Sequence, residues 1–168
     1  MTGLTDFKGN IIHVGVAEWK TGGASDALRT TLGSCVGIVL YSSKKKAGGI
    51  AHILLAEPPA GRIVNKAKYA STATLALAAE LNRIGVENGD LTARLFGGAS
   101  MFETVGSNFM NNIGTDNVNA ARKAVESLMI PVIAEDVGGT VGRTITLFMD
   151  DGRLLLRAGG KEKYIYKA

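Results

Sequence analysis

Two segments of the chain carry apolar residues at the spacing of an amphipathic helix. Between Lys66 and Ile84 the apolar positions recur every three or four residues, and Gly85 follows where the pattern stops. A second pattern runs from about Asp116 to Met129, with Thr115 in position to cap its first turn. The predicted buried faces comprise Tyr69, Ala73, Leu77, Ala78 and Leu81 in the first segment, and Val118, Ala121, Val125 and Leu128 in the second. We therefore expect two helices that pack on a sheet.

Shorter apolar runs predict the strands of that sheet. Cys35–Tyr41 and Gly49–Ala56 flank a polar turn, the pattern of a β-hairpin with a longer loop. A second hairpin is expected where two apolar runs flank Asp150-Asp151-Gly152. The full set of expected strands covers residues 11–19, 35–41, 49–56, 91–96, 131–137, 143–150 and 153–158, with a last strand around 164–165 and a loop over 21–27.

These elements predict an α+β fold in which mixed β-sheets pack together and helices flank them. The 168 residues fit a single domain. The 22 glycines are spread along the chain, so they indicate tight turns and no interdomain linker. We expect one domain over residues 1–168, with residues 1–10 as a loose N-terminal segment.

Composition and charge narrow the function classes only slightly. Hydrophobic residues make up 46% and charged residues 20% of the chain, and no apolar stretch approaches the length of a membrane span. The N-terminus has no pattern of a secretory signal, and one cysteine cannot form an internal disulfide, so we expect a cytoplasmic protein. The net charge of +4 comes without a basic stripe interleaved with aromatic residues, so charge alone does not indicate nucleic-acid binding.

The single cysteine, Cys35, lies at the start of the first hairpin strand, and His52 lies in the second. In an antiparallel hairpin, the numbers of facing residues add to a constant. A constant of 89 pairs Gly37 with His52, and a constant of 87 pairs Cys35 with His52. Both registers place the thiol and the imidazole on the same face, whereas a slip by one residue separates them. Gly37 is expected to leave space between them for a substrate side chain.

A thiol beside an imidazole is typical of nucleophilic attack on an amide or ester. His52 would take the thiol proton, and the backbone N–H of Cys35, with that of Gly33 or Ser34, would stabilise the oxyanion. Thr30 or Thr31 would orient the histidine or bind substrate, with Glu57 and Asp26 as further candidates. The alternative is that Cys35 and His52 are inert core residues. Two histidines and one cysteine do not show the spacing of metal ligands, and no metal is expected.

The run Gly97-Gly98-Ala99-Ser100-Met101-Phe102 follows a predicted strand and allows two interpretations. It is either a strand end with a flexible turn or a loop that lines the cleft or presents Phe102 to a partner. Gly98, Ser100 and Phe102 are therefore candidate residues of a cleft or partner-binding loop.

A set of short motifs occurs in order along most of the chain: Leu32-Gly33-Ser34-Cys35-Val36, Gly48-Gly49-Ile50-Ala51-His52-Ile53-Leu54-Leu55, Lys68-Tyr69-Ala70, Gly97–Phe102, Asn112-Ile113-Gly114, Asn117-Val118, Ala134–Gly139 and Gly142-Arg143. Together these motifs resemble the CheD family of chemoreceptor glutamine deamidases. The family fold in turn resembles the cysteine-hydrolase toxins that deamidate glutamine, with packed β-sheets and helices outside.

The resemblance implies that Cys35 is the nucleophile and His52 the general base and acid. The reaction would hydrolyse glutamine side-chain amides in cytoplasmic receptor helices to glutamate, through a thioester and without a cofactor. Some family members are also credited with hydrolysing receptor methyl esters, and many bind a CheC-type phosphatase of the response regulator CheY. Neither nucleic-acid binding nor membrane insertion is implied.

One position departs from the family pattern. Some members carry a functional threonine six residues before the cysteine, where this chain has Arg29. Thr30, five before, is the nearest match and Thr31 the second. This shift keeps open a different class of function, a non-catalytic chemotaxis adaptor that binds receptors or a CheC-type partner.

Overall fold

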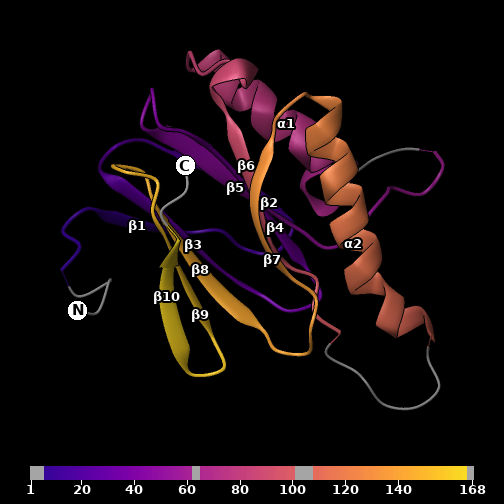
Figure 1. Cartoon of the computed structure of the whole chain (residues 1–168). Coiled ribbons are helices and arrows are strands. Elements are labelled where there is room, and N and C mark those ends of the chain that lie inside the picture. The colour runs from indigo at the N-terminus through magenta and orange to yellow at the C-terminus, as the bar shows by residue number, and fades with distance from the viewer. Residues whose placement is uncertain (1–5, 62–64, 101–107, 166–168) are drawn as a thin grey trace.

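The computed structural model describes residues 6–61, 65–100 and 108–165. Within them the chain forms two five-stranded sheets, in the orders β1-β3-β8-β9-β10 and β2-β5-β4-β6-β7 (Figure 1). The strands are β1 Asn10–His13, β2 Glu18–Gly22, β3 Asp26–Leu32, β4 Val36–Ser42, β5 Ala47–Ile53, β6 Thr92–Gly97, β7 Val132–Val137, β8 Arg143–Phe148, β9 Leu154–Ala158 and β10 Lys161–Ile165. The helices are α1 Ala70–Arg83 and α2 Asn108–Ser127, with short 3₁₀ turns at Lys66–Lys68 and Asn88–Asp90.

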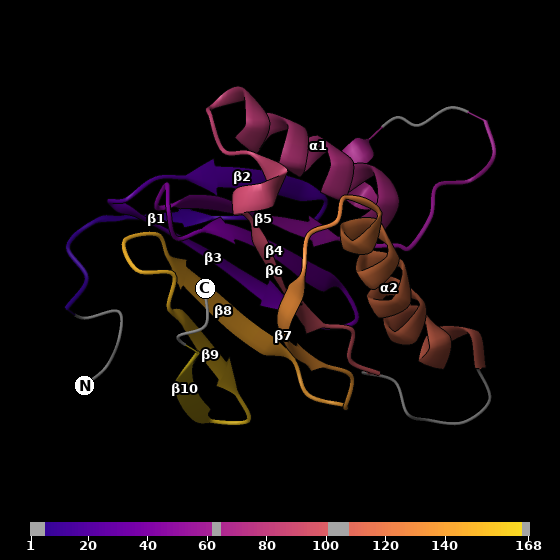
Figure 2. The same cartoon turned by 45° about the horizontal axis from the view of Figure 1, so that its top comes forward.

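The two sheets and the helices form three layers. Both helices lie on the outer face of the β2-β5-β4-β6-β7 sheet, and the other sheet lies against its inner face (Figures 1 and 2). Each sheet is mixed, because β1 pairs parallel to β3 and β6 parallel to β7 while the remaining pairs are antiparallel. This arrangement confirms the predicted α+β fold of packed mixed sheets with flanking helices.

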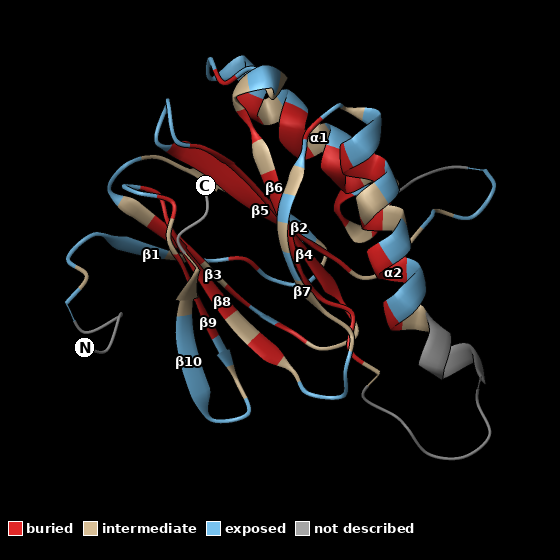
Figure 3. Cartoon of the chain, viewed as in Figure 1, coloured by how far each residue is buried: buried red, intermediate tan, exposed pale blue. Residues whose placement is uncertain are grey.

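The β4–β5 hairpin lies at the centre of the molecule. Every residue of both strands is buried (Figure 3). One face of the hairpin, including Ile38, Leu40 and Ala51, packs under the helices, and the opposite face, including Val39 and Ile50, packs against the other sheet. Burial on both faces explains why these strands are continuous apolar runs in the sequence.

The predicted first strand, residues 11–19, is wrong. It is two strands, β1 and β2, which belong to different sheets, and the chain turns between them, with Ala17 at a φ of 58°. The predicted loop over 21–27 is too long, because β2 extends to Gly22 and β3 begins at Asp26, which leaves only residues 23–25 as the loop. Strand β3 carries Thr30, so the error concerns an element of the candidate site.

The hairpins and helices were predicted more closely. Strands β4 and β5 pair as a hairpin, β8 pairs with β9, and β10 adds the expected final strand. The first helix begins at Ala70, because Tyr69 is extended and bridges to Leu55. The second begins at Asn108, so Thr115 lies inside the helix and does not cap it.

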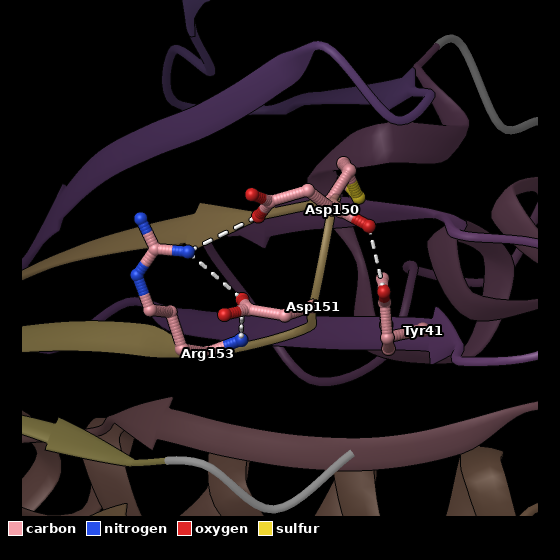
Figure 4. Close-up of polar contacts among 5 residues, drawn as sticks. Tyr41, Asp150, Asp151 and Arg153 are labelled. Carbon is pink, nitrogen blue, oxygen red and sulfur yellow. Dashed lines mark hydrogen bonds and ion pairs between the residues drawn. The ribbon is translucent and has the colours of Figure 1, made fainter. Parts of the chain in front are cut away.

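A hydrogen bond joins the two sheets at the end of the sandwich where β4 finishes. The Tyr41 hydroxyl donates to the Met149 carbonyl at 2.6 Å (Figure 4). Beside it, the Arg153 guanidinium contacts Asp150 at 3.1 Å and Asp151 at 2.9 Å, which fixes the turn between β8 and β9. The turn is therefore anchored both to its own sheet and to the opposite one.

At the N-terminal side, Phe7 packs its ring edge-on against Phe148, and residues 1–5 lie outside the described part of the chain.

Neither described helix combines the length and the apolar character that crossing a bilayer requires.

Candidate active site

The segment Gly33-Ser34-Cys35 carries the chain from β3 in one sheet to β4 in the other. Each of its three carbonyl oxygens accepts a hydrogen bond from a neighbouring element. The Gly33 oxygen accepts from the Ala99 N–H at 3.0 Å, and the Cys35 oxygen accepts from the Gly98 N–H at 2.8 Å. The Ser34 oxygen accepts from the Asn117 side-chain amide at 3.1 Å. The nucleophile candidate therefore sits on a backbone segment that neighbouring elements fix on both sides.

Cys35 and His52 lie on the same face of the central hairpin. Gly37 pairs with His52 and Val36 with Ile53, which is the register with constant 89, one of the two predicted. That face points into the space between the two sheets, where Cys35 is 9% and His52 2% exposed. Continuing this register by one position would set Leu54 opposite Cys35, which places the thiol one diagonal step from the imidazole on the same side of the hairpin.

Thr30 fixes the tautomer of His52. The Thr30 hydroxyl donates its one proton to the Val14 carbonyl at 2.7 Å. The same oxygen lies 2.7 Å from His52 Nδ1, so it must accept a proton from Nδ1. The Nε2 atom therefore carries the lone pair. This atom is buried and has no hydrogen-bond partner among the residues that the structure describes, which leaves it available as a base.

Burial keeps both candidate groups uncharged at neutral pH. It lowers the pKa of His52 to about 4, against a smaller opposing effect from the Glu18 carboxylate on the neighbouring strand. It also raises the pKa of the Cys35 thiol, which the backbone N–H of Cys35 partly counteracts. The resting pair is thus a thiol and a neutral imidazole, so a base must remove the thiol proton during attack.

The backbone geometry supplies an oxyanion donor beside the thiol. The peptide bonds are trans, so each N–H points opposite to the carbonyl of the residue before it. The Ser34 carbonyl points to Asn117, and the Cys35 N–H consequently points away from that helix residue. By the same rule, the Ser34 N–H points away from Ala99, which holds the Gly33 carbonyl.

The remaining sequence candidates for the third group lie elsewhere. Thr31 bonds to the hydroxyl of Thr144 at 3.0 Å on the exposed side of its strand, so it does not meet His52. Asp26 begins β3 and accepts from the Gly23 N–H at 2.8 Å, at the end of the strand away from Thr30. Glu57 lines a surface cavity of about 300 Å³ together with Asp116 and Asn117.

The expected open space at Gly37 is absent. A Cβ added at Gly37 would lie 3.0 Å from a methyl carbon of Leu32 and 3.4 Å from one of Ile145. The core fills the region over Gly37, so a substrate side chain cannot enter there, and this expectation is wrong.

The glycine-rich loop after β6 packs behind the nucleophile segment. Gly97 and Gly98 have φ values of 101° and 67°, and a Cβ at Gly97 would lie 2.2 Å from the Cys35 carbonyl oxygen. The N–H of Ser100 donates to the Gly139 carbonyl at 2.8 Å, which ties the loop to the end of β7. Phe102 lies outside the described residues.

Arg143 supports this loop from the opposite sheet. Its guanidinium contacts the Asp136 carboxylate at 2.6 Å, the Gly138 carbonyl at 2.9 Å and the Gly97 carbonyl at 3.3 Å. Such a bridge could not be found from the sequence, because Arg143 and Gly97 approach only once the two sheets stack. The local sequence did not indicate the hydrogen bonds of Val14 and Asn117 either.

Among the described residues, no three or more His, Cys, Asp and Glu side chains gather closely enough to hold a metal ion. The chemistry that the site itself offers is that of a thiol, an imidazole, a hydroxyl and backbone amides.

Comparison with known proteins shows which family this chain belongs to. The family described as CheD chemotactic sensory transduction matches residues 54–158. The chemoreceptor glutamine deamidase CheD of Halalkalibacterium halodurans is 42% identical over 151 residues, which cover 88% of this chain and 93% of that protein. A probable chemoreceptor glutamine deamidase CheD of Geobacillus kaustophilus is 43% identical over 156 residues, with coverage of 90% and 94%. A protein of the same name from Moorella thermoacetica is 42% identical, with coverage of 89% and 92%. This chain belongs to the CheD family.

Proposed function

We propose that this protein is a cysteine-dependent deamidase that hydrolyses glutamine side-chain amides of chemoreceptors to glutamate in chemotaxis. The observation that carries the proposal is the hydrogen-bonded chain from Val14 through Thr30 to His52, which leaves Nε2 with a bare lone pair on the face that Cys35 shares. The names of the relatives at about 40% identity support the same substrate class.

The first chemical step is attack on the amide carbon. Nε2 of His52 takes the thiol proton as the sulfur of Cys35 forms its bond to that carbon, which turns the carbonyl into an oxyanion. The N–H groups of Cys35 and Ser34 donate to this oxyanion. In the resting structure Nε2 makes no hydrogen bond within the described part of the chain, so the thiol must move toward it when substrate binds.

The second step releases ammonia. The oxyanion re-forms the carbonyl, the carbon–nitrogen bond breaks, and His52 gives its proton to the leaving nitrogen, which leaves a thioester on Cys35. Water then loses a proton to Nε2 and attacks the thioester carbon, and the displaced sulfur takes that proton back from Nε2. The products are a glutamate side chain and the regenerated thiol. Thr30 holds the imidazole in the same orientation throughout.

The proposal extends to partners and place of action. The substrate lies in the cytoplasmic helices of chemoreceptors, so the protein works in the cytoplasm. A CheC-type phosphatase is the proposed protein partner. Because a methyl ester can be attacked by the same thiol through the same thioester, receptor methylesterase activity is proposed as a side reaction.

Mass spectrometry of receptor cytoplasmic fragments tests the main proposal. We expect fragments incubated with the wild-type protein to gain the mass of amide-to-acid conversion at particular glutamines, and to gain none with Cys35→Ala. Receptors from the same cell must be used as substrates. A protein that binds these fragments tightly but changes no glutamine would contradict the deamidase proposal and favour the adaptor alternative.

A further inference from the structure

Asn117 is a buried polar residue for which the proposed mechanism has no use so far. It lies on α2 and is 1% exposed. Its side-chain Nδ2 donates to two carbonyl oxygens, that of Ser34 at 3.1 Å and that of Leu54 at 3.0 Å. Ser34 directly precedes Cys35, and Leu54 follows His52 by two residues. One amide group therefore touches both strand ends that carry the candidate catalytic pair.

These two strand ends separate at the same point. Val36 and Ile53 form the last pair of the β4–β5 ladder. Beyond it, the N–H groups of Leu54 and Leu55 turn away and donate to the Lys68 carbonyl at 2.9 and 3.0 Å. The Asn117 amide bridges the gap where the next ladder pair would otherwise stand, so it sets how far apart the two ends lie.

The hydrogen bond from Asn117 to the Ser34 carbonyl also affects the proposed oxyanion donor, the Cys35 N–H. The Ser34 carbonyl and the Cys35 N–H belong to one peptide group, so fixing the carbonyl fixes the direction of the N–H. A hydrogen bond accepted by the carbonyl also polarises the group and strengthens the N–H as a donor. The same N–H lowers the pKa of the Cys35 thiol by stabilising its thiolate.

We propose that Asn117 is a positioning residue for catalysis, which holds Cys35 against His52 and aims the Cys35 N–H at the oxyanion. The inference rests on the proposed deamidation but makes a separate statement about the thiol. If Asn117 aims this N–H, then losing the side-chain amide must weaken an interaction that stabilises the thiolate, whatever the substrate.

Two variants and one control test the inference. Asn117→Ala removes both hydrogen bonds, and Asn117→Asp keeps the shape but presents an acceptor to two carbonyl oxygens. Asn119→Ala is the matched control, because Asn119 lies on the same helix, is exposed and, among the described residues, bonds through its side chain only to Arg122. The melting temperature of each variant gives the temperature below which that variant is folded.

Steady-state kinetics on a receptor fragment form the first readout. Both Asn117 variants are expected to lower kcat by about tenfold or more with little change in KM, since misplacing reacting groups by a fraction of an ångström has effects of this order. The Asn119→Ala control is expected to keep the wild-type kcat. A wild-type kcat in Asn117→Ala would overturn the inference.

Alkylation by iodoacetamide forms the second readout, and it needs no receptor. Because Cys35 is the only cysteine in the chain, the reaction reports on this thiol alone. The pH midpoint of the alkylation rate is expected to rise in both Asn117 variants and to stay unchanged in Asn119→Ala. A purely structural role would lower the melting temperature and leave the midpoint of the folded protein where it is.

The two readouts separate the two proposals. If the wild-type protein deamidates no receptor but the alkylation midpoint rises in the Asn117 variants, the proposed function fails and the positioning of the Cys35 N–H stands. If the wild type is active and neither kcat nor the midpoint depends on Asn117, the positioning inference fails alone.

Discussion

At the scale of single residues, one proton decides how the candidate site works. The Thr30 hydroxyl has a single proton, and the Val14 carbonyl takes it, so the oxygen of Thr30 faces His52 purely as an acceptor. This arrangement forces the imidazole proton onto Nδ1 and frees Nε2. Residue type alone left Thr30 and Thr31 as alternatives. The structure separates them, since alternate residues of a strand point to opposite faces.

Replacing Thr30 therefore tests the role of its oxygen. Thr30→Val keeps the shape but loses the hydroxyl, and we expect kcat/KM for receptor deamidation to fall by about a hundredfold as the histidine tautomer and orientation are lost. Thr30→Ser should retain most of the activity. Thr31→Val is the matched control, because its hydroxyl bonds to that of Thr144 on the exposed side of the strand and does not face His52. Equal losses in the two valine variants would contradict the assignment to Thr30.

The depressed pKa of His52 predicts a pH dependence of stability. Its pKa is about 4 when folded, below the value near 6.5 of an unfolded histidine. Between these values the unfolded chain binds the extra proton, so the free energy of unfolding must fall as the pH decreases from about 6.5 to 4. The loss from this group alone is about 3 kcal/mol.

Urea unfolding of the wild type and of His52→Gln across this pH range measures the effect. Carboxylates also titrate there, so the difference between the two proteins isolates the histidine. We expect the stability advantage of the wild type over His52→Gln to shrink as the pH falls. A difference that stays constant would mean that the imidazole is not buried in its neutral form.

At the scale of elements, the sequence predicted what local pattern controls. The β4–β5 hairpin and its parity were correct because both strands are apolar runs joined by a polar turn. The single strand over 11–19 was wrong because the break around Ala17 depends on pairing with two different sheets. Strand β3 was missed since Thr30, Thr31 and Arg29 interrupt its apolar alternation, and they are polar for reasons that appear only in the folded molecule.

The start of α2 is a second feature that the local sequence pattern could not predict. Gly114 interrupts the helical pattern, yet the helix passes through it because its backbone lies against that of Gly98. A Cβ at Gly114 would come within 2.3 Å of the Gly98 carbonyl oxygen. This close approach seats the helix that carries Asn117 directly on the loop behind Cys35. Nothing in the local sequence announces a contact between residues so far apart.

Alanine at Gly98 should disturb this contact between elements. A Cβ there would lie 2.4 Å from a methyl carbon of Val118 and 2.9 Å from the Gly114 carbonyl oxygen. Gly139→Ala is the matched control, because Gly139 has nearly the same φ, 70° against 67°, but its Cβ would meet no atom of the described residues within 4 Å. The left-handed backbone costs about 1 kcal/mol or more in both variants.

We expect Gly98→Ala to lose more unfolding free energy than Gly139→Ala, by about 1 to 3 kcal/mol for the overpacking, and to lower deamidation as well. Thermal unfolding and the receptor assay give the two values. If the two variants are equally stable and equally active, the contact between loop and helix does not hold the site.

At the scale of the whole molecule, the site lies where the chain crosses from one sheet to the other. Hydrogen bonds join the two sheets at both ends of the sandwich. Arg143 links them near Cys35, through Asp136 and the Gly97 carbonyl, and Tyr41 links them at the other end through Met149. Thr30 belongs to one sheet and His52 to the other, so their 2.7 Å contact depends on how the sheets stack.

The remote link should serve stability and not chemistry. Tyr41→Phe removes one hydrogen bond and leaves the Met149 carbonyl without its partner, so we expect the free energy of unfolding to fall by about 1 to 3 kcal/mol. The kcat of the folded variant should stay at the wild-type value, because the change lies at the end of β4 away from Cys35. A large drop in kcat well below the melting temperature would contradict this division between the two ends.

The central claim is that Cys35 forms a thioester with the glutamine side chain, and hydroxylamine tests it most directly. Hydroxylamine competes with water for a thioester, so we predict that adding it to the receptor reaction converts part of the glutamate product into glutamyl hydroxamate at the same positions. Mass spectrometry of the receptor peptides should show both products with the wild type and neither with Cys35→Ala. Deamidation that persists in Cys35→Ala, or that never yields hydroxamate, would contradict the account.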